Sequence, residues 1–197
     1  MLPIPKLWRD VKAWRQRRPA HQARLLEQAV QACSDHDQES LERCLDEGLD
    51  VNAVQVQGSA VRPRPRSLLA LAAEWGFEEG LILLLIRGAE PNGGPPSTRY
   101  GQTPLQVLLG HTIDDANLRM GRSLIEGGAR LEVKSHVLHS GGDRAWLSFT
   151  ESLSDCSQNK QDAWKPMVEW AAVVERARRL DQALPAAGDK APRSPRF

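Results

Sequence analysis

The chain has 197 residues, of which 41% are hydrophobic and 26% are charged, and its formal net charge is +1. This length is sufficient for one domain with its own core. The near-zero net charge excludes a general electrostatic attraction to nucleic acid or anionic membranes. The charge is unevenly placed, because residues 1–24 carry seven Lys and Arg against one acid, whereas residues 25–183 carry 16 basic and 23 acidic side chains.

The cysteine count and the hydropathy pattern indicate a cellular compartment. Three cysteines, Cys33, Cys44 and Cys156, are an odd number, which is typical of a reducing compartment. No apolar stretch reaches the roughly 18 residues of a membrane helix, and the N-terminal segment lacks the apolar region of a signal peptide. We therefore expect a soluble, cytoplasmic protein. Arginine outnumbers lysine 20 to 6, which is typical of a GC-rich genome and favours a bacterial source.

Residues 1–23 form a basic segment that contains KLWRDVKAWRQRR. Leu7, Val11 and Trp14 share one face of a predicted helix, with basic residues around them. Such a segment can cap the first structural unit, lie on a membrane surface or contact nucleic acid. We favour the cap, because Trp8 and Trp14 would otherwise be exposed.

From residue 24 onward, a pattern repeats with a period of 40 residues, marked by Gly48, Gly88 and Gly128. Each glycine follows an apolar segment. It precedes a small or apolar residue, a polar residue, an apolar residue or Pro, and then Asn or Glu. A Leu-x-x-(Ala/Leu) segment lies upstream of each glycine. The pattern predicts three units, at residues 24–53, 67–92 and 103–133.

The middle unit, SLLALAAEWGFEEGLILLLIRGAEPN, is typical of two short antiparallel helices. Ser67 can cap the first helix, and Gly76 can reverse the chain. The second helix, at about residues 78–87, contains the apolar run Leu81–Ile86, in which leucines recur at three- and four-residue spacing. Gly88 suits the left-handed position that ends a helix. We expect Leu81, Leu84 and Leu85 to face the core, and Ile82 and Ile86 to meet adjoining helices or the rim.

These units resemble the ankyrin repeat over residues 24–133. The resemblance implies an all-α repeat fold, an α-solenoid of helix-turn-helix units with hairpin-like loops and helical N- and C-terminal caps. The family period is 33 residues, and the additional residues here fall in an enlarged finger at residues 54–66 and between the helices of the third unit. The family motif TPLH reads TPLQ at residues 103–106, and the missing histidine is expected to weaken the hydrogen-bond link between adjacent units.

The remaining residues are predicted to form a C-terminal cap at residues 134–183 and a tail. RAWLSFTESL, at residues 144–153, is expected to be a degenerate first helix, and a longer closing helix should follow over residues 162–184. Residues 184–197 are Pro-rich and basic, which is typical of a disordered tail.

No motif for catalysis or for metal binding is present. Cys33, His36 and Cys44 do not have a recognised zinc-ligand spacing. The sequence contains neither a phosphate-binding glycine loop nor a nucleophile elbow. We therefore expect no enzymatic activity, no metal, no cofactor and no small-molecule substrate.

Candidate partner-binding residues follow from the family pattern and from the finger. The finger alternates Arg and Pro, which favours an extended left-handed chain with its guanidinium groups pointing outward. Trp75 and Tyr100 are candidate anchors, because aromatic residues often dominate interface energetics; packing of Trp75 onto Phe77, and of Tyr100 within its hairpin, are the alternatives. The complete predicted set is Arg62, Arg64, Arg66, Glu74, Trp75, Arg99, Tyr100, Gln102 and His111.

The sequence thus predicts a non-catalytic module that binds a partner protein through its concave face and its Arg-Pro finger. The arginines predict an acidic patch on that partner. A bacterial inhibitor or immunity protein for one cognate toxin or enzyme would fit this description. The alternative is an adaptor that the basic N-terminal segment tethers to a membrane or to nucleic acid.

Overall fold

The computed structural model describes residues 6–59, 62–93, 102–138 and 144–183. Within these residues the fold is mostly helical, with eight helices and two small antiparallel hairpins. The predicted tail at residues 184–197 lies outside the described residues, as do residues 1–5 and the candidate residues Arg99 and Tyr100.

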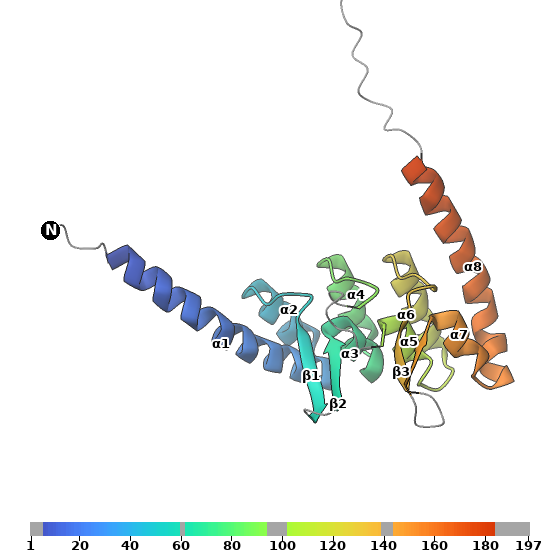
Figure 1. The fold of residues 1–197 in the computed structure, drawn as a ribbon, viewed down its shortest axis with the longest axis horizontal. Helices are drawn as coiled ribbons and strands as arrows, with labels where there is room; N and C mark the ends of the chain where they lie inside the picture. The colour runs from blue at the N-terminus through green and yellow to red at the C-terminus, as the bar shows by residue number, and fades with distance from the viewer. Residues whose placement is uncertain (1–5, 60–61, 94–101, 139–143, 184–197) are drawn as a thin grey trace, which may run out of the picture.

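The helices form consecutive pairs that stand side by side in a row (Figure 1). The first helix of each pair contacts the first helix of the next, and the second helices contact one another in the same order. The two inner pairs therefore have neighbours on both sides. The pairs are α1 (Lys6–Asp35) with α2 (Gln38–Asp46), α3 (Leu68–Trp75) with α4 (Glu78–Ile86), α5 (Pro104–Leu108) with α6 (Asp115–Glu126), and α7 (Phe149–Ser154) with α8 (Gln158–Ala183).

Two hairpins connect successive pairs and extend from the same side of the row (Figure 1). Strands β1 (Val54–Ser59) and β2 (Arg62–Ser67) join the first pair to the second. Strands β3 (Ser135–Leu138) and β4 (Arg144–Leu147) join the third pair to the fourth. The Arg-Pro segment is therefore one strand of a hairpin, rather than the expected left-handed extended chain.

Helix α1 is one continuous element, and this differs from the expected division at residue 23. It runs through Pro19, although a proline inside a helix removes one backbone hydrogen bond. The surrounding sequence is rich in Ala, Gln, Arg and Leu, which are strong helix formers. The predicted N-terminal capping segment is instead the first part of α1, and it extends beyond the end of the row (Figure 1).

The expected helix at residues 144–153 begins later than the sequence pattern suggested. Residues 144–147 pair with β3 instead. Ser148 then starts α7, because its hydroxyl accepts the N–H of Glu151 while the Glu151 carboxylate accepts the N–H of Ser148. This reciprocal capping fixes the first helical residue at Phe149.

The second helix of each of the first three pairs ends in the same turn. Gly48, Gly88 and Gly128 have φ angles of 93°, 86° and 113°, a region that other residues enter only with strain. The following residue returns its N–H to the helix, as when Ala89 donates to the carbonyl of Leu84 at 2.9 Å. The expectation that Gly88 ends its helix in the left-handed conformation is confirmed.

Side-chain amides join each of these turns to the next one. The side-chain oxygen of Asn52 accepts the N–H of Glu90 at 2.7 Å, and that of Asn92 accepts the N–H of Arg130 at 2.8 Å. Asn92 also donates to the carbonyl of Gly128 at 3.3 Å. These bonds satisfy backbone groups that the turns themselves leave open.

The first turn receives the same contact from α1. The side-chain oxygen of Gln22 accepts the N–H of Asp50 at 3.1 Å, and its amide nitrogen donates to the carbonyl of Gly48 at 2.7 Å. Asp50, Glu90 and Arg130 are spaced 40 residues apart, so they occupy equivalent positions. We call these three contacts the turn ladder: Gln22 to Asp50, Asn52 to Glu90, and Asn92 to Arg130.

The apolar run in α4 lies at the centre of the row. Leu81 and Leu84 are fully buried, and Leu83 is nearly so. Leu85 packs at the edge of the core, whereas Ile82 and Ile86 are exposed. One side of α4 is therefore buried against the neighbouring helices, while its other side exposes apolar side chains to solvent.

Gln106, which replaces the histidine of the family motif in TPLQ, links the third pair to the hairpin that follows it. Its amide nitrogen donates to the carbonyl of Leu147 at 2.7 Å. Its side-chain oxygen accepts hydrogen bonds from the Ser135 hydroxyl and from the N–H of Thr103. A glutamine can supply both a donor and an acceptor, so the link does not need the histidine.

The turn ladder predicts a measurable contribution to stability. Asn92→Ala should lower the free energy of unfolding by about 1–2 kcal/mol, because the Arg130 N–H loses its acceptor. Urea denaturation followed by circular dichroism measures this change. The matched control is Asn159→Ala on the exposed face of α8, which should change stability by less than about 0.5 kcal/mol. Equal effects of the two substitutions would contradict the structural role of Asn92.

Candidate interaction surface

The cysteines and His36 do not assemble a reactive or metal-binding site. Among the described residues, no group of three His, Cys, Asp or Glu side chains is placed to hold a metal ion. Cys33 and Cys44 are buried. Burial, together with repulsion from Cys44, raises the pKa of the Cys33 thiol to about 12, and burial also raises the pKa of Cys44. Both thiols therefore remain protonated at neutral pH, and they pack as apolar side chains.

His36 instead joins the first pair to the second. Its Nε2 donates to the carbonyl of Trp75 at 2.8 Å. Its ring stacks on Phe77, with ring centroids 5.2 Å apart and planes 7° apart. The turn between α1 and α2 is thus fastened to the end of α3.

Arg66 and Glu74 hold the base of the first hairpin against α3. The guanidinium of Arg66 lies 3.6 Å from the Glu74 carboxylate, and the Arg66 side chain is only 12% exposed. This placement differs from the expectation that all the finger arginines point outward. The second carboxylate oxygen of Glu74 is buried without a hydrogen bond from any described residue, so the Glu74 carboxylate is incompletely satisfied at the hairpin base.

Trp75 lies at the C-terminal end of α3, where it is partly buried against the core. The preceding residue, Glu74, pairs with Arg66 at the base of the first hairpin. The structure supports a packing role for the Trp75 ring. Contact between the exposed part of the ring and a partner stays a prediction.

The other predicted site residues are spread along the row. Gln102 and His111 are half-buried at opposite ends of the segment that contains α5. Positions 62 and 64 fall on the same face of the first hairpin as Arg66, because residues alternate between the faces of a strand; the side chains of Arg62 and Arg64 lie outside the described part of the chain.

The hairpins carry two exposed apolar residues that the sequence analysis did not select. Val56 in β1 is 66% exposed, and Trp146 in β4 is 50% exposed. Both hairpins project from the same side of the row (Figure 1). The alternation VQVQ at residues 54–57 was a detectable strand signal, whereas Trp146 was hidden within a segment predicted to be helical. We call the surface formed by the two hairpins and the end of α3 the hairpin face.

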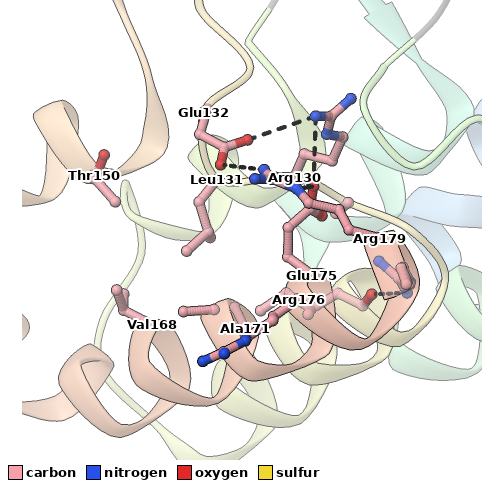
Figure 2. A pocket seen from close by; sticks show the side chains of 13 residues that line it. Arg130, Leu131, Glu132, Thr150, Val168, Ala171, Glu175, Arg176 and Arg179 are labelled. Carbon is pink, nitrogen blue, oxygen red and sulfur yellow. Dashed lines mark hydrogen bonds and ion pairs between the residues drawn. The ribbon is translucent and has the colours of Figure 1, made fainter. Parts of the chain in front are cut away.

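A second feature is a hollow of about 470 Å³ between α8 and the turn that follows α6 (Figure 2). Apolar side chains from both elements form its interior, and charged side chains surround it. Its lining includes Ile125, Ala129, Leu131, Val168, Ala171 and Ala172, with Arg130, Glu132, Glu175 and Arg179 at the rim.

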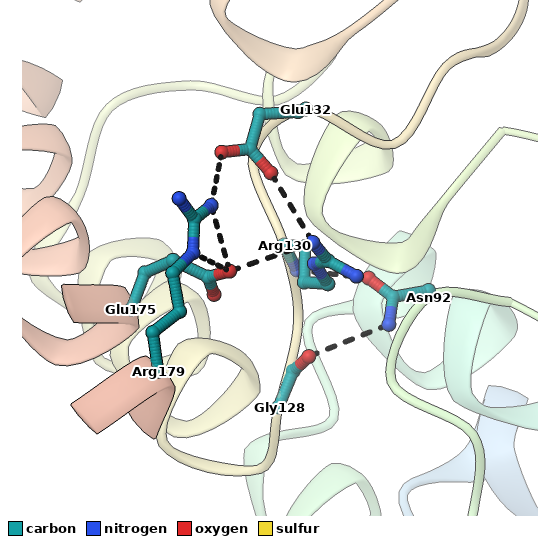
Figure 3. Close-up of polar contacts among 6 residues, drawn as sticks. All are labelled: Asn92, Gly128, Arg130, Glu132, Glu175 and Arg179. Atoms are coloured by element: carbon teal, nitrogen blue, oxygen red, sulfur yellow. Dashed lines mark hydrogen bonds and ion pairs between the residues drawn. The ribbon is translucent and has the colours of Figure 1, made fainter. Parts of the chain in front are cut away.

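The charged rim holds α8 against the last turn of the ladder (Figure 3). Glu175 lies 3.5 Å from Arg130 and 3.2 Å from Arg179. Glu132 lies 3.5 Å from Arg179 and 3.9 Å from Arg130, so two acids and two arginines alternate. Arg178 adds hydrogen bonds of 2.6 and 2.9 Å to the last carbonyls of α6. We assign this network to closing the C-terminal end of the row.

Two further observations bear on function. Within the described segments, none of the helices combines the length and the apolarity needed to cross a bilayer. No protein-family model matches this chain, and no curated protein matches it either. A function must therefore be argued from the residues and the geometry of this chain.

The burial of Trp75 leads to a stability prediction. Trp75→Ala should lower the free energy of unfolding by about 2 kcal/mol, because a half-buried ring leaves the core edge. Trp75→Phe should recover most of this loss. Thermal and urea denaturation measure both variants, and an unchanged midpoint for Trp75→Ala would contradict the packing role.

The burial of the thiols predicts the order in which the cysteines react. In the folded protein a disulfide reagent such as DTNB should modify Cys156 first, because this thiol is half-buried while Cys33 and Cys44 are buried. Cys156→Ser should remove the fast phase of the reaction, and denaturation should release the other two thiols. A fast phase that persists in Cys156→Ser would contradict the buried placement of Cys33 and Cys44.

Proposed function

We propose that this chain is an ankyrin-type repeat protein, in which successive helix pairs form a short solenoid. Three features support this assignment: the 40-residue spacing of left-handed glycines, the turn ladder between equivalent positions, and hairpins that precede two of the first helices. Gln22 at one end and Arg178 at the other make end contacts, as the terminal units of a repeat array require.

We infer that the protein is a non-catalytic module that binds a partner protein on its hairpin face, the concave face of an ankyrin-type array. The observation that carries this inference is the exposure of Val56 and Trp146 on two hairpins that project from the same side. Exposed apolar side chains on one side of a protein are candidates for an interaction surface, and tryptophan is strongly enriched among interface anchors.

The charge of the first hairpin favours an acidic partner. The segment VQVQGSAVRPRPRS, at residues 54–67, contains three arginines and no acidic residue. Arginine pairs well with carboxylates, and a local excess of one charge accelerates encounter with the opposite charge. A short array with one such face suits a dedicated inhibitor or immunity protein for a single toxin or enzyme.

A tethered adaptor is the second candidate, and the course of α1 favours it. The N-terminal part of this helix extends beyond the row (Figure 1), and residues 1–24 carry seven basic residues against one acid. In this alternative, binding to anionic vesicles or to nucleic acid would fall steeply with salt and would be lost on deletion of residues 1–18.

The test of the proposed function compares two exposed apolar positions on different sides of the row. The partner is first isolated by affinity capture from the source cell, and its affinity for the purified protein is then measured by calorimetry. Trp146→Ala should weaken binding by about 30-fold, as expected for an interface anchor worth about 2 kcal/mol.

The matched control is Ile86→Ala in α4, which is 76% exposed on a second helix and should leave the affinity unchanged. If Ile86→Ala weakens binding and Trp146→Ala does not, the partner binds the second helices and the hairpin face is wrong.

A further inference from the structure

The two edges of the first hairpin differ in their hydrogen-bonding capacity. In an antiparallel pair, opposed residues alternate between those that exchange hydrogen bonds with each other and those whose N–H and C=O groups point away from the partner strand. Pro63 and Pro65 lie opposite Gly58 and Val56 in the register. A proline has no N–H to donate, so these are the pairs whose backbone groups point outward.

The outer edge of β2 is therefore blocked. Its outward positions at residues 63 and 65 are both proline, and they present carbonyls without the N–H groups that a third strand needs. Proline at alternate outward positions is a known protection of edge strands.

The outer edge of β1 is open. Val54, Val56 and Gly58 alternate with the residues that bond to β2, so their N–H and C=O groups point away from the hairpin. Among the described residues, β1 pairs only with β2. Outside that ladder, no backbone hydrogen bond between described residues involves Val54 or Val56. The side chain of Val56 is 66% exposed. The strand VQVQGS contains neither proline nor a charged residue.

We propose that β1 accepts an extended, acidic segment of the partner protein as a third strand of this hairpin. This inference rests on the proposed function, and it specifies how the partner is bound. Backbone hydrogen bonds to Val54, Val56 and Gly58 supply the affinity of such strand addition, and the alternating side chains supply its specificity.

The register predicts the composition of the added segment. Residues directly opposite Val54 and Val56 share their face, where apolar β-branched side chains pack best. The intervening residues share the face of Gln55 and Arg66. Acidic residues suit these positions, because positions 62 and 64 of β2 are arginines that lie about two strand spacings, roughly 10 Å, from the added strand. Arg66 adds little to this attraction, since Glu74 already pairs with it.

The same charge disfavours a second copy of this chain as the occupant. Pairing two β1 strands would place two hairpins in one four-stranded sheet, each with Arg62 and Arg64 in addition to the Arg66 that Glu74 pairs. Like charges at this separation repel one another, and only salt would reduce the cost.

The experiment uses two synthetic peptides, Ac-EVEVEVE-NH2 and Ac-KVKVKVK-NH2, with the full-length protein. Binding is followed by amide chemical shifts and by hydrogen exchange. The glutamate peptide should slow exchange of the Val54 and Val56 amides, and its affinity should fall as salt rises to about 0.5 M. The lysine peptide should bind at least tenfold more weakly.

Two variants test the open edge itself. Val56→Pro removes an outward N–H while leaving the bonds between β1 and β2, and it should weaken binding of the glutamate peptide at least tenfold. Val56→Thr keeps the N–H and the β-branched shape, and it should bind within about twofold of the original protein. The Arg66 amide shift reports whether the hairpin of Val56→Pro is intact. If the hairpin is lost, strand addition is judged from the unaltered protein, by whether the glutamate peptide slows exchange of the Val54 and Val56 amides.

Several results would overturn the proposal: equal binding of both peptides, no protection of the β1 amides, unchanged binding by Val56→Pro with an intact hairpin, or a dimer that Val56→Pro dissociates. The partner isolated by affinity capture separates this inference from the proposed function. A partner that depends on Trp146 but tolerates Val56→Pro would leave the hairpin face correct and the strand addition wrong.

Discussion

The row of helix pairs depends on one recurring contact, in which a side-chain amide satisfies the backbone of the next turn. The second helix of each of the first three pairs ends at a left-handed glycine, and the residue two positions later has an N–H that its own turn does not bind. Asn52 and Asn92 provide acceptors for these groups, so each turn is positioned by the one before it. The contact sets the separation of the pairs, while burial of the leucines of α4 and their neighbours supplies most of the free energy.

At the two ends of the row, other side chains bind the backbone groups that a neighbouring turn would otherwise bind. Gln22 takes the place of a preceding turn at the N-terminal end, which requires α1 to pass beside the first turn. At the C-terminal end, Arg178 binds the last carbonyls of α6, and the alternating ion pairs around Glu175 hold α8 in place (Figure 3). Between these ends, Arg66 and Glu74 hold the first hairpin against α3. This hairpin is part of the surface that we propose for partner binding.

Much of this arrangement could be predicted from local sequence, because its determinants are local. Gly88 and the caps at Ser67 and Thr103 act within one or two turns of chain, and the leucine spacing in α4 follows helical geometry. Apart from the unbroken course of α1 through Pro19, the predictions that failed involve contacts with partners elsewhere in the chain. Gln106 bonds to Leu147, 41 residues away, Arg66 is drawn inward by Glu74, and residues 144–147 pair with β3 instead of joining α7. The open edge of β1 depends on the strand register, which places Pro65 opposite Val56 and cannot be derived from the local sequence.

The role of the turn ladder is tested most directly by native-state hydrogen exchange at the amides of Asp50, Glu90 and Arg130. The N–H of each of these residues donates to a side-chain oxygen of the ladder. These residues lie in exposed turns, where amides without a partner exchange at nearly the rate of an unstructured peptide. All three amides should exchange at least about 100-fold more slowly than that rate. Asn92→Ala should remove the protection of the Arg130 amide, while the Asp50 amide keeps its own. Exchange at the unstructured rate at two or more of these positions would contradict the role of the turn ladder.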